Sequence, residues 1–300
     1  MSMLQETAHQ AVQAAATAPP TLKEQAVANL EAAASGHGGA FDAGESIFHH
    51  LSNSQVIDLE PFGTIRLPTL HLLGWALPIT KHLVMIWLAS AIIIALLWLA
   101  NRRRSLVPKG IHNVMEMVVV FVRDELARKN IGDHGDRYVP YLLSTFVFIL
   151  VCNLLGLLPY GATATGNISV TAGLAGMAFV MIQAAGIREY GLAGHFKNLV
   201  PHGMPVWLLP IMIPVEIMGL FTKPFALCVR LFANMTAGHV VILSLISLVF
   251  ILKSAWVGVV LSVPFSLFIN GIELLVAFLQ AYIFTMLTSL FIGMAAHPAH

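Results

Sequence analysis

Charge is scarce in this sequence of 300 residues, and the scarcity decides the class of protein. Lys, Arg, Asp and Glu make up 10% of the chain, whereas soluble proteins carry about a quarter. Residues 138–300 hold only five basic and three acidic side chains, too few to cover the surface of a soluble fold. With 57% hydrophobic residues and a mean hydropathy of +0.80, the sequence predicts an integral membrane protein and excludes the soluble enzyme classes.

Cysteine and metal-binding patterns are also scarce. The only cysteines, Cys152 and Cys228, lie in apolar runs and are too few for a disulfide framework. The sequence has no CxxC, HExxH or GxSxG motif, so we expect neither a metal, a cofactor nor the catalytic set of an intramembrane hydrolase. A net charge of +1 gives no reason to expect a nucleic-acid partner.

Composition divides the chain into three regions. Residues 1–45 are rich in alanine and predict a flexible tail, without the pattern of a cleavable signal. Residues 46–81 predict an extracytoplasmic segment. Within it, residues 46–67 mix polar and apolar side chains around Pro61 and Gly63, so a short amphipathic helix is the alternative there. Residues 82–300 predict the membrane domain.

Apolar runs in this domain predict an all-α fold. We expect five transmembrane helices, near residues 82–100, 138–158, 168–187, 206–252 and 256–294. Charges lie close to the short apolar run within 110–130, which predicts a helix on the membrane surface. Three arginines, 102–104, follow the first span, so the N-terminus is expected outside and the C-terminus in the cytoplasm.

The last two helices are too long for an upright span. About 35 helical residues reach ~50 Å, against a hydrocarbon core of ~30 Å. These helices must be strongly tilted, kinked or partly outside the membrane.

Ionisable residues inside these spans are the candidate functional groups, because a charge at bilayer depth costs several kcal/mol. On a wheel of 100° per residue, Glu216, Lys223 and Asn234 fall within about 40° of Arg230. His239 falls on the opposite face, so either the helix is distorted or His239 serves a second surface. On the last helix, one face carries Ser266, Glu273 and Gln280.

Several of these residues also have structural interpretations. Lys223 could extend to the headgroups, and Glu216 could be solvated near the same surface. His239 could be a hydrogen-bonded packing residue, and Gln280 could join two helices. Arg230 lies several turns from either helix end, keeps its charge, and has no acid three or four residues away. It therefore indicates a carboxylate partner elsewhere.

The segment RLFANMTAGH, residues 230–239, resembles the RLFxNMxAGx signature of subunit a of F-type ATP synthase, the membrane stator beside the ring of c subunits. The resemblance covers most of residues 46–294. It includes PVE at 214–216, TKP at 222–224, NLLGLLP at 153–159, NISVT at 167–171, LQAYIF at 279–284 and FHHL at 48–51.

The resemblance implies a role for each residue that matches the signature. Arg230 is expected to be the stator arginine and Gln280 the glutamine that faces it. His239 and Glu273 are expected in the proton-entry half-channel, in the mitochondrial order of histidine then acid. Depth and register add Asn270 to the inlet, Glu216 to the outlet and Asn234 to the stripe of Arg230.

Partners and location follow from the same resemblance. It implies a ring of c subunits whose carboxylate faces Arg230, b-type peripheral stalk subunits, an indirect link to the F1 sector, and a lipid bilayer. It favours a bacterial inner membrane over a mitochondrial one. Ligands on the ring would choose between H⁺ and Na⁺.

An ion-coupled secondary transporter is the alternative from another class. It would use Glu216, Arg230 and Glu273 for its substrate, and would be expected to have two related halves. The sequence shows no internal repeat.

Overall fold

The computed structural model describes residues 56–59, 63–66, 69–72, 75–102, 110–158, 163–198, 207, 209–252 and 255–296. All of them belong to one compact unit that begins at Ala43. The predicted tail, 1–45, lies outside the described residues.

Two short hairpins precede the first long helix. Strand β1 (Val56–Leu59) pairs antiparallel with β2 (Gly63–Arg66), and β3 (Thr69–Leu72) pairs antiparallel with β4 (Trp75–Pro78). The alternative of a short amphipathic helix is therefore wrong for these residues. Proline and glycine interrupt the segment too often for a helix, and its isoleucine, valine and threonine residues favour extended backbone.

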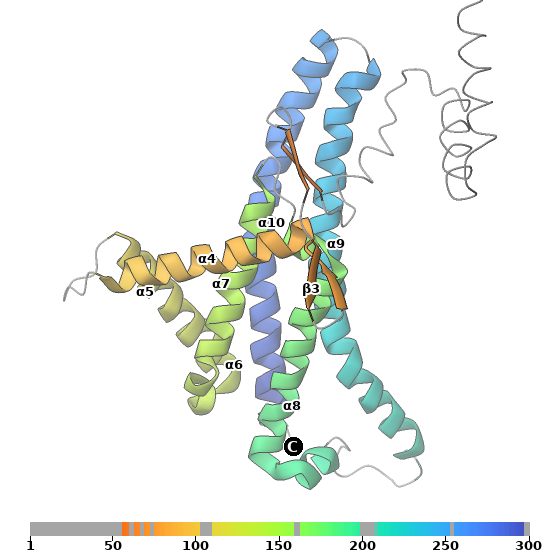
Figure 1. Ribbon diagram of the computed structural model, residues 1–300. Coiled ribbons are helices and arrows are strands. Elements are labelled where there is room, and N and C mark those ends of the chain that lie inside the picture. The colour runs from red at the N-terminus through yellow and green to blue at the C-terminus, as the bar shows by residue number, and fades with distance from the viewer. Residues whose placement is uncertain are drawn as a thin grey trace, which may run out of the picture. The chain divides into compact units, whose positions relative to one another are not determined.

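Five long apolar helices make up most of the remaining described chain and confirm the predicted all-α membrane domain. They are α4 (Lys81–Arg102), α7 (Val139–Gly156), α8 (Ile168–Asn198), α9 (Leu209–Leu252) and α10 (Ala255–Ala296). Figure 1 shows α9 and α10 side by side as a long antiparallel pair, with α4 running at a steep angle to them.

Helix α8 continues beyond its predicted end at residue 187. Arg188 and Glu189, predicted in a loop, are helical, and the chain turns only at Gly191, whose φ is 70°. Glycine suits this turn because it adopts positive φ without steric cost. The charges of Arg188 and Glu189 do not end α8, because charged side chains near a helix terminus can extend to water.

Short helices link α4 to α7. They are α5 (Ile111–Phe121), the π-helical η1 (Val122–Arg128), α6 (Lys129–Ile131) and the 3₁₀-helical η2 (Asp133–Arg137). Arg128 holds η1 to η2 by a bidentate ion pair with Asp136, at 2.8 Å for each bond. Hydrogen bonding and charge from Arg128 lower the pKa of the Asp136 carboxyl.

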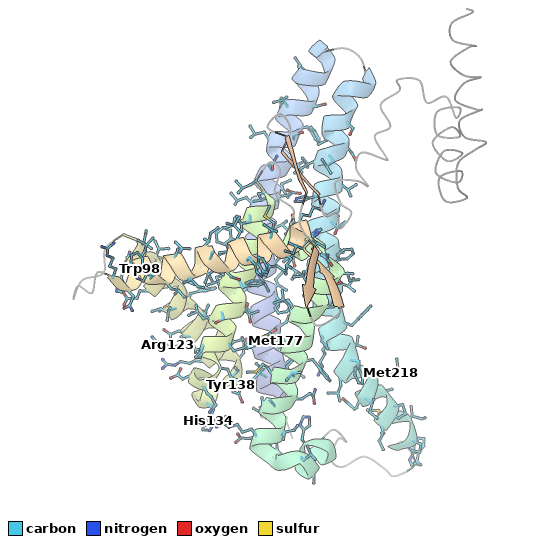
Figure 2. All side chains as sticks on the ribbon, in the orientation of Figure 1. Trp98, Arg123, His134, Tyr138, Met177 and Met218 are labelled. Atoms are coloured by element: carbon cyan, nitrogen blue, oxygen red, sulfur yellow. The ribbon has the colours of Figure 1, made fainter. Side chains whose placement is uncertain are left out.

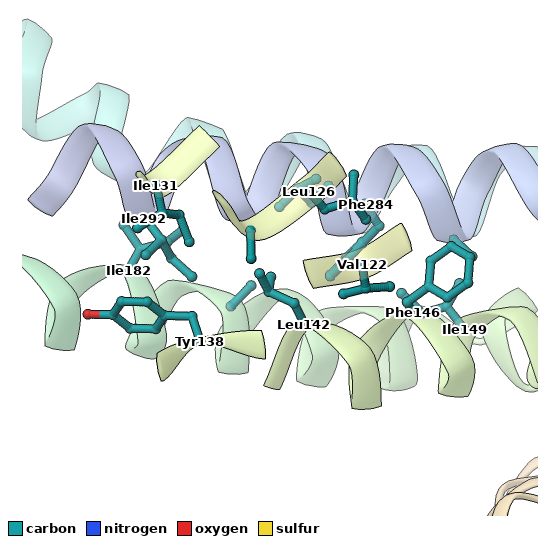
Figure 3. Packing of buried hydrophobic residues seen from close by; sticks show 14 of the residues in the cluster. Val122, Leu126, Ile131, Tyr138, Leu142, Phe146, Ile149, Ile182, Phe284 and Ile292 are labelled. Carbon is teal, nitrogen blue, oxygen red and sulfur yellow. The ribbon is translucent and has the colours of Figure 1, made fainter. Parts of the chain in front are cut away.

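These linkers pack against the end of α10. The Asn130 Nδ2 atom donates to the Ser289 Oγ atom at 2.9 Å. Gly293 allows this approach, because a Cβ atom there would overlap the Asn130 carbonyl oxygen. Ile131 and Ile292 extend the contact as fully buried side chains (Figure 3).

Small residues allow the helices of the core to approach closely. Ala127, Ala178 and Ala281 are fully buried among Leu126 and Leu142. Inside lipid, helices associate by such packing and by hydrogen bonds, since the surrounding tails are themselves apolar. Large apolar side chains on the outer surfaces, such as Trp98 and Met218 in Figure 2, are exposed as expected for lipid contact.

Candidate functional site

Helix α9 presents Arg230 on its exposed face. Leu227, Leu231 and Met235 form the buried face of this helix, whereas Arg230 and Asn234 are exposed. Within the part of the chain that the structure describes, no carboxylate pairs with Arg230 and no hydrogen bond reaches it. A permanent cation in a 36-residue apolar span thus has no counter-charge among the described residues.

Two contacts fix the register of α9 against α10. The Lys223 Nζ atom lies 5.3 Å from the centre of the Phe291 ring, and the His239 Nδ1 atom lies 3.9 Å from the Glu273 Oε1 atom. This antiparallel register puts Arg230 and Gln280 within about one helical turn of each other. Gln280 is buried, and no hydrogen bond among the described residues joins it to Arg230.

His239 and Glu273 form the second group of the site. Glu273 is 8% exposed, and its two carboxylate oxygens have no hydrogen-bond partner among the described residues. At 3.9 Å, the Glu273 carboxylate and the imidazole are too far apart for a hydrogen bond but close enough to form one after a shift of about 1 Å. The lack of a side chain at Gly238 leaves room for the Glu273 carboxylate.

The other ring nitrogen of His239 faces the turn that joins α7 to α8, a contact that the sequence did not predict. The turn is η3 (Ala164–Gly166), just after α7. The His239 Nε2 atom lies 2.8 Å from the Thr163 Oγ1 atom and 3.0 Å from the Gly156 carbonyl oxygen. His239 therefore serves a second surface of α9, which explains its position opposite Arg230 on the wheel.

Asn153 fastens this turn to the neighbouring helices. It is fully buried, donates from Nδ2 to the Ala277 carbonyl at 3.3 Å, and accepts at Oδ1 from the Thr165 hydroxyl at 2.7 Å. In the sequence, Asn153 lies before an apolar stretch and Thr163 and Thr165 lie after it. This pattern could have predicted the contacts of the turn, because polar side chains at membrane depth need partners.

The remaining predicted site residues are not brought together. The Asn270 Nδ2 atom donates to the Ser266 carbonyl of its own helix at 2.9 Å. Glu216 is half-buried near the start of α9, and Lys223 covers Phe291. Their roles in an inlet or outlet stay predictions.

The fold and the site define a class: a polytopic helical membrane protein with ionisable side chains deep within its spans. The family described as ATP synthase A chain matches residues 83–293. The chain belongs to this family.

Three similar proteins come from bacteria. The "ATP synthase subunit a 2" of Prosthecochloris aestuarii is 52% identical over 278 residues, covering 91% of this chain and 86% of the relative. The "ATP synthase subunit a 2" of Chlorobaculum tepidum is 48% identical, covering 97% and 85%. The "ATP synthase subunit a" of Chlorobium phaeobacteroides strain DSM 266 is 52% identical, covering 89% and 79%.

Proposed function

We propose that this chain is the proton-translocating stator subunit of an F-type ATP synthase, working against a rotating ring of c subunits. Family membership makes it a component of that complex and not an enzyme by itself. The observation that carries the proposal is Arg230, an exposed cation in an apolar span with no partner among the described residues.

Arg230 supplies the charge that releases the proton from the ring. A guanidinium 4 Å from a carboxylate favours the ionised form by about 4 kcal/mol at an effective dielectric of 20. When a protonated ring carboxylate arrives beside Arg230, the proton leaves toward the cytoplasmic side. The same charge separates the inlet from the outlet, so that protons do not leak between them.

Glu273 and His239 form the inlet on the outer side of Arg230. Nine residues separate Arg230 from His239 and seven separate Gln280 from Glu273, which are rises of about 13 Å and 10 Å along antiparallel helices. Protons enter past this pair and neutralise the ring carboxylate, which can then face lipid. Asn270 lines the inlet, Glu216 lines the outlet, and Asn234 and Gln280 border Arg230.

The tilt of the α9–α10 pair lets one chain serve both half-channels. The 36-residue span of α9 is about 54 Å long, so it fits a ~30 Å core at a tilt of about 55°. Helix α4, with 22 residues, is about 33 Å long and fits the ~30 Å core at a tilt of about 25°. The steep angle between α4 and the pair in Figure 1 agrees with both fits.

Partners and orientation complete the proposal. The chain lies in a bacterial inner membrane with its N-terminus outside and its C-terminus in the cytoplasm. It contacts the c-ring through the face of α9 that carries Arg230, is held by b-type peripheral stalk subunits, and meets the F1 sector indirectly.

Purification of the tagged chain from native membranes distinguishes this function from an ion-coupled transporter. We expect a ring of small hairpin subunits to copurify, and the complex in vesicles to make ATP when a pH gradient is imposed. The chain alone in liposomes should move no solute. Transport by the isolated chain, without a ring, would favour the transporter.

A further inference from the structure

We infer that the Gly156 carbonyl and the Thr163 hydroxyl hold His239 in the tautomer that carries its proton on Nε2, so that Nδ1 alone exchanges protons with Glu273. The inference deepens the proposed function, on which it rests. It makes Thr163 a positioning residue for the inlet.

The Gly156 carbonyl and the Thr163 hydroxyl together select the tautomer, because both lie within hydrogen-bond distance of Nε2. A carbonyl oxygen only accepts hydrogen bonds, whereas a hydroxyl can donate or accept. At 3.0 Å from the Gly156 oxygen, a bare Nε2 would set two lone pairs against each other, and a protonated Nε2 makes a hydrogen bond. The Nε2–H group therefore points to the Gly156 oxygen, with the Thr163 Oγ1 atom at 2.8 Å as a second acceptor.

The opposite nitrogen then has a defined task. With Nε2 protonated, neutral His239 carries a lone pair on Nδ1, the atom that faces the Glu273 Oε1 atom. When the two side chains close to hydrogen-bond distance, a protonated Glu273 gives its proton to Nδ1, leaving a carboxylate beside an imidazolium. The proton can leave only from Nδ1, since Nε2–H stays bound to Gly156. The His239 imidazole thus takes up and returns protons at Nδ1 beside Glu273 and does not relay them from one ring nitrogen to the other.

The backbone around Gly156 is shaped for this contact. A Cβ atom at residue 156 would overlap the Thr163 side chain, so glycine lets the turn close onto the end of α7. Thr163 is 5% exposed, and its Oγ1 atom contacts the His239 Nε2 atom. Because Gly156 contributes through its backbone, Thr163 is the partner that a substitution can test.

The test compares three variants in the intact ATP synthase. Thr163→Val removes the hydroxyl at nearly constant volume, and Thr163→Ser retains it. Thr165→Val controls for loosening of the turn: it removes a hydroxyl from the same turn at nearly constant volume, but that hydroxyl donates to Asn153 and not to His239.

The spectroscopic measurement is nitrogen NMR of the complex labelled with ¹⁵N-histidine, with His239→Gln used to assign the ring signals by difference. We expect a pyrrole-type Nε2 and a pyridine-type Nδ1 in the native complex, in Thr163→Ser and in Thr165→Val. We expect Thr163→Val to show a mixture of tautomers, because the imidazole, no longer held by the hydroxyl, can turn away from the Gly156 carbonyl. A bare Nε2 in the native complex, or an unchanged tautomer in Thr163→Val, would overturn the inference.

ATP synthesis in vesicles gives the functional measurement. The loss of one positioning hydrogen bond should lower the proton-driven rate about three- to tenfold in Thr163→Val, with Thr163→Ser near the native rate. If Arg230→Ala and Glu273→Gln abolish synthesis while Thr163→Val keeps the native rate and tautomer, this inference fails and the proposed function stands. If Arg230→Ala also keeps the native rate, the proposed function itself fails.

Discussion

Substitution of Gly238 by alanine tests the geometry of the inlet through a single methyl group. A Cβ atom at residue 238 would overlap the Glu273 Oε1 atom and lie 3.0 Å from the carboxyl carbon. The end of a glutamate side chain is flexible, so the carboxylate should retreat by about 1 Å while the helices stay in place. It would then leave its position 3.9 Å from the His239 Nδ1 atom.

The expected loss follows from the sensitivity of proton transfer to distance. A misplacement of about 1 Å can cost on the order of 100-fold in rate, so we expect ATP synthesis driven by a pH gradient to fall about 10- to 100-fold. The amount of assembled complex should stay the same. An immunoblot measures the amount of complex in membrane vesicles, and the rate of ATP synthesis is normalised to that amount. Glu273→Gln gives the rate expected when the inlet carboxylate is absent.

Gly173→Ala, on helix α8, is the matched control. An added Cβ atom at residue 173 meets no atom within 4 Å, and alanine favours a helix over glycine by up to about 1 kcal/mol. This variant should synthesise ATP at the native rate. Native synthesis by Gly238→Ala would refute the proposed role of the carboxylate position.

Three further predictions concern the frame of the site. Asn153→Leu should destabilise the complex by about 2–3 kcal/mol, because the Thr165 hydroxyl and the Ala277 carbonyl lose their partner; thermal denaturation checks it, and an unchanged midpoint would contradict it. Gly293→Ala should cost about 1–3 kcal/mol by forcing α10 away from the Asn130 carbonyl, seen as a lower yield of assembled complex. Asp136→Asn should expose residues 122–137 to protease at neutral pH while assembly persists. Because the fold lowers the pKa of Asp136, its ion pair stabilises the native chain at neutral pH, and this stabilisation is lost as the pH falls below about 4. The native chain should therefore show the same cleavage only below about pH 4. Equal cleavage of the native chain and Asp136→Asn at pH 7 would count against the ion pair.

The long helices could be predicted from sequence because lipid imposes a strong rule. Every apolar run longer than about 18 residues must be helical to satisfy its backbone, which is why the expected spans agree with α4, α7, α9 and α10 to within a few residues. The end of α8 could not be predicted, because Arg188 is as acceptable in the last helical turns as in a loop. The hairpins were missed because four-residue strands give too short an alternation to detect.

The candidate site also has a part that could be predicted from the sequence and a part that could not. Arg230 could be singled out because an ionised side chain in an apolar run is expensive, whatever surrounds it. The partners of His239 could not, because Gly156 acts through its backbone carbonyl and Thr163 is an ordinary residue for a connecting turn. Their roles depend on how the end of α7 meets α9, which is a tertiary contact between residues 83 positions apart.

The central claim is that Arg230 acts as the fixed cation that faces the ring carboxylate. Lys223→Ala provides a matched comparison, since it removes a cation from the same stripe of α9 whose contact is the Phe291 ring. Proton-driven ATP synthesis in vesicles that contain equal amounts of assembled Arg230→Ala and Lys223→Ala complexes tests the claim most directly. We expect synthesis to be abolished in Arg230→Ala and largely retained in Lys223→Ala. Coupled synthesis at the native rate in Arg230→Ala would contradict it.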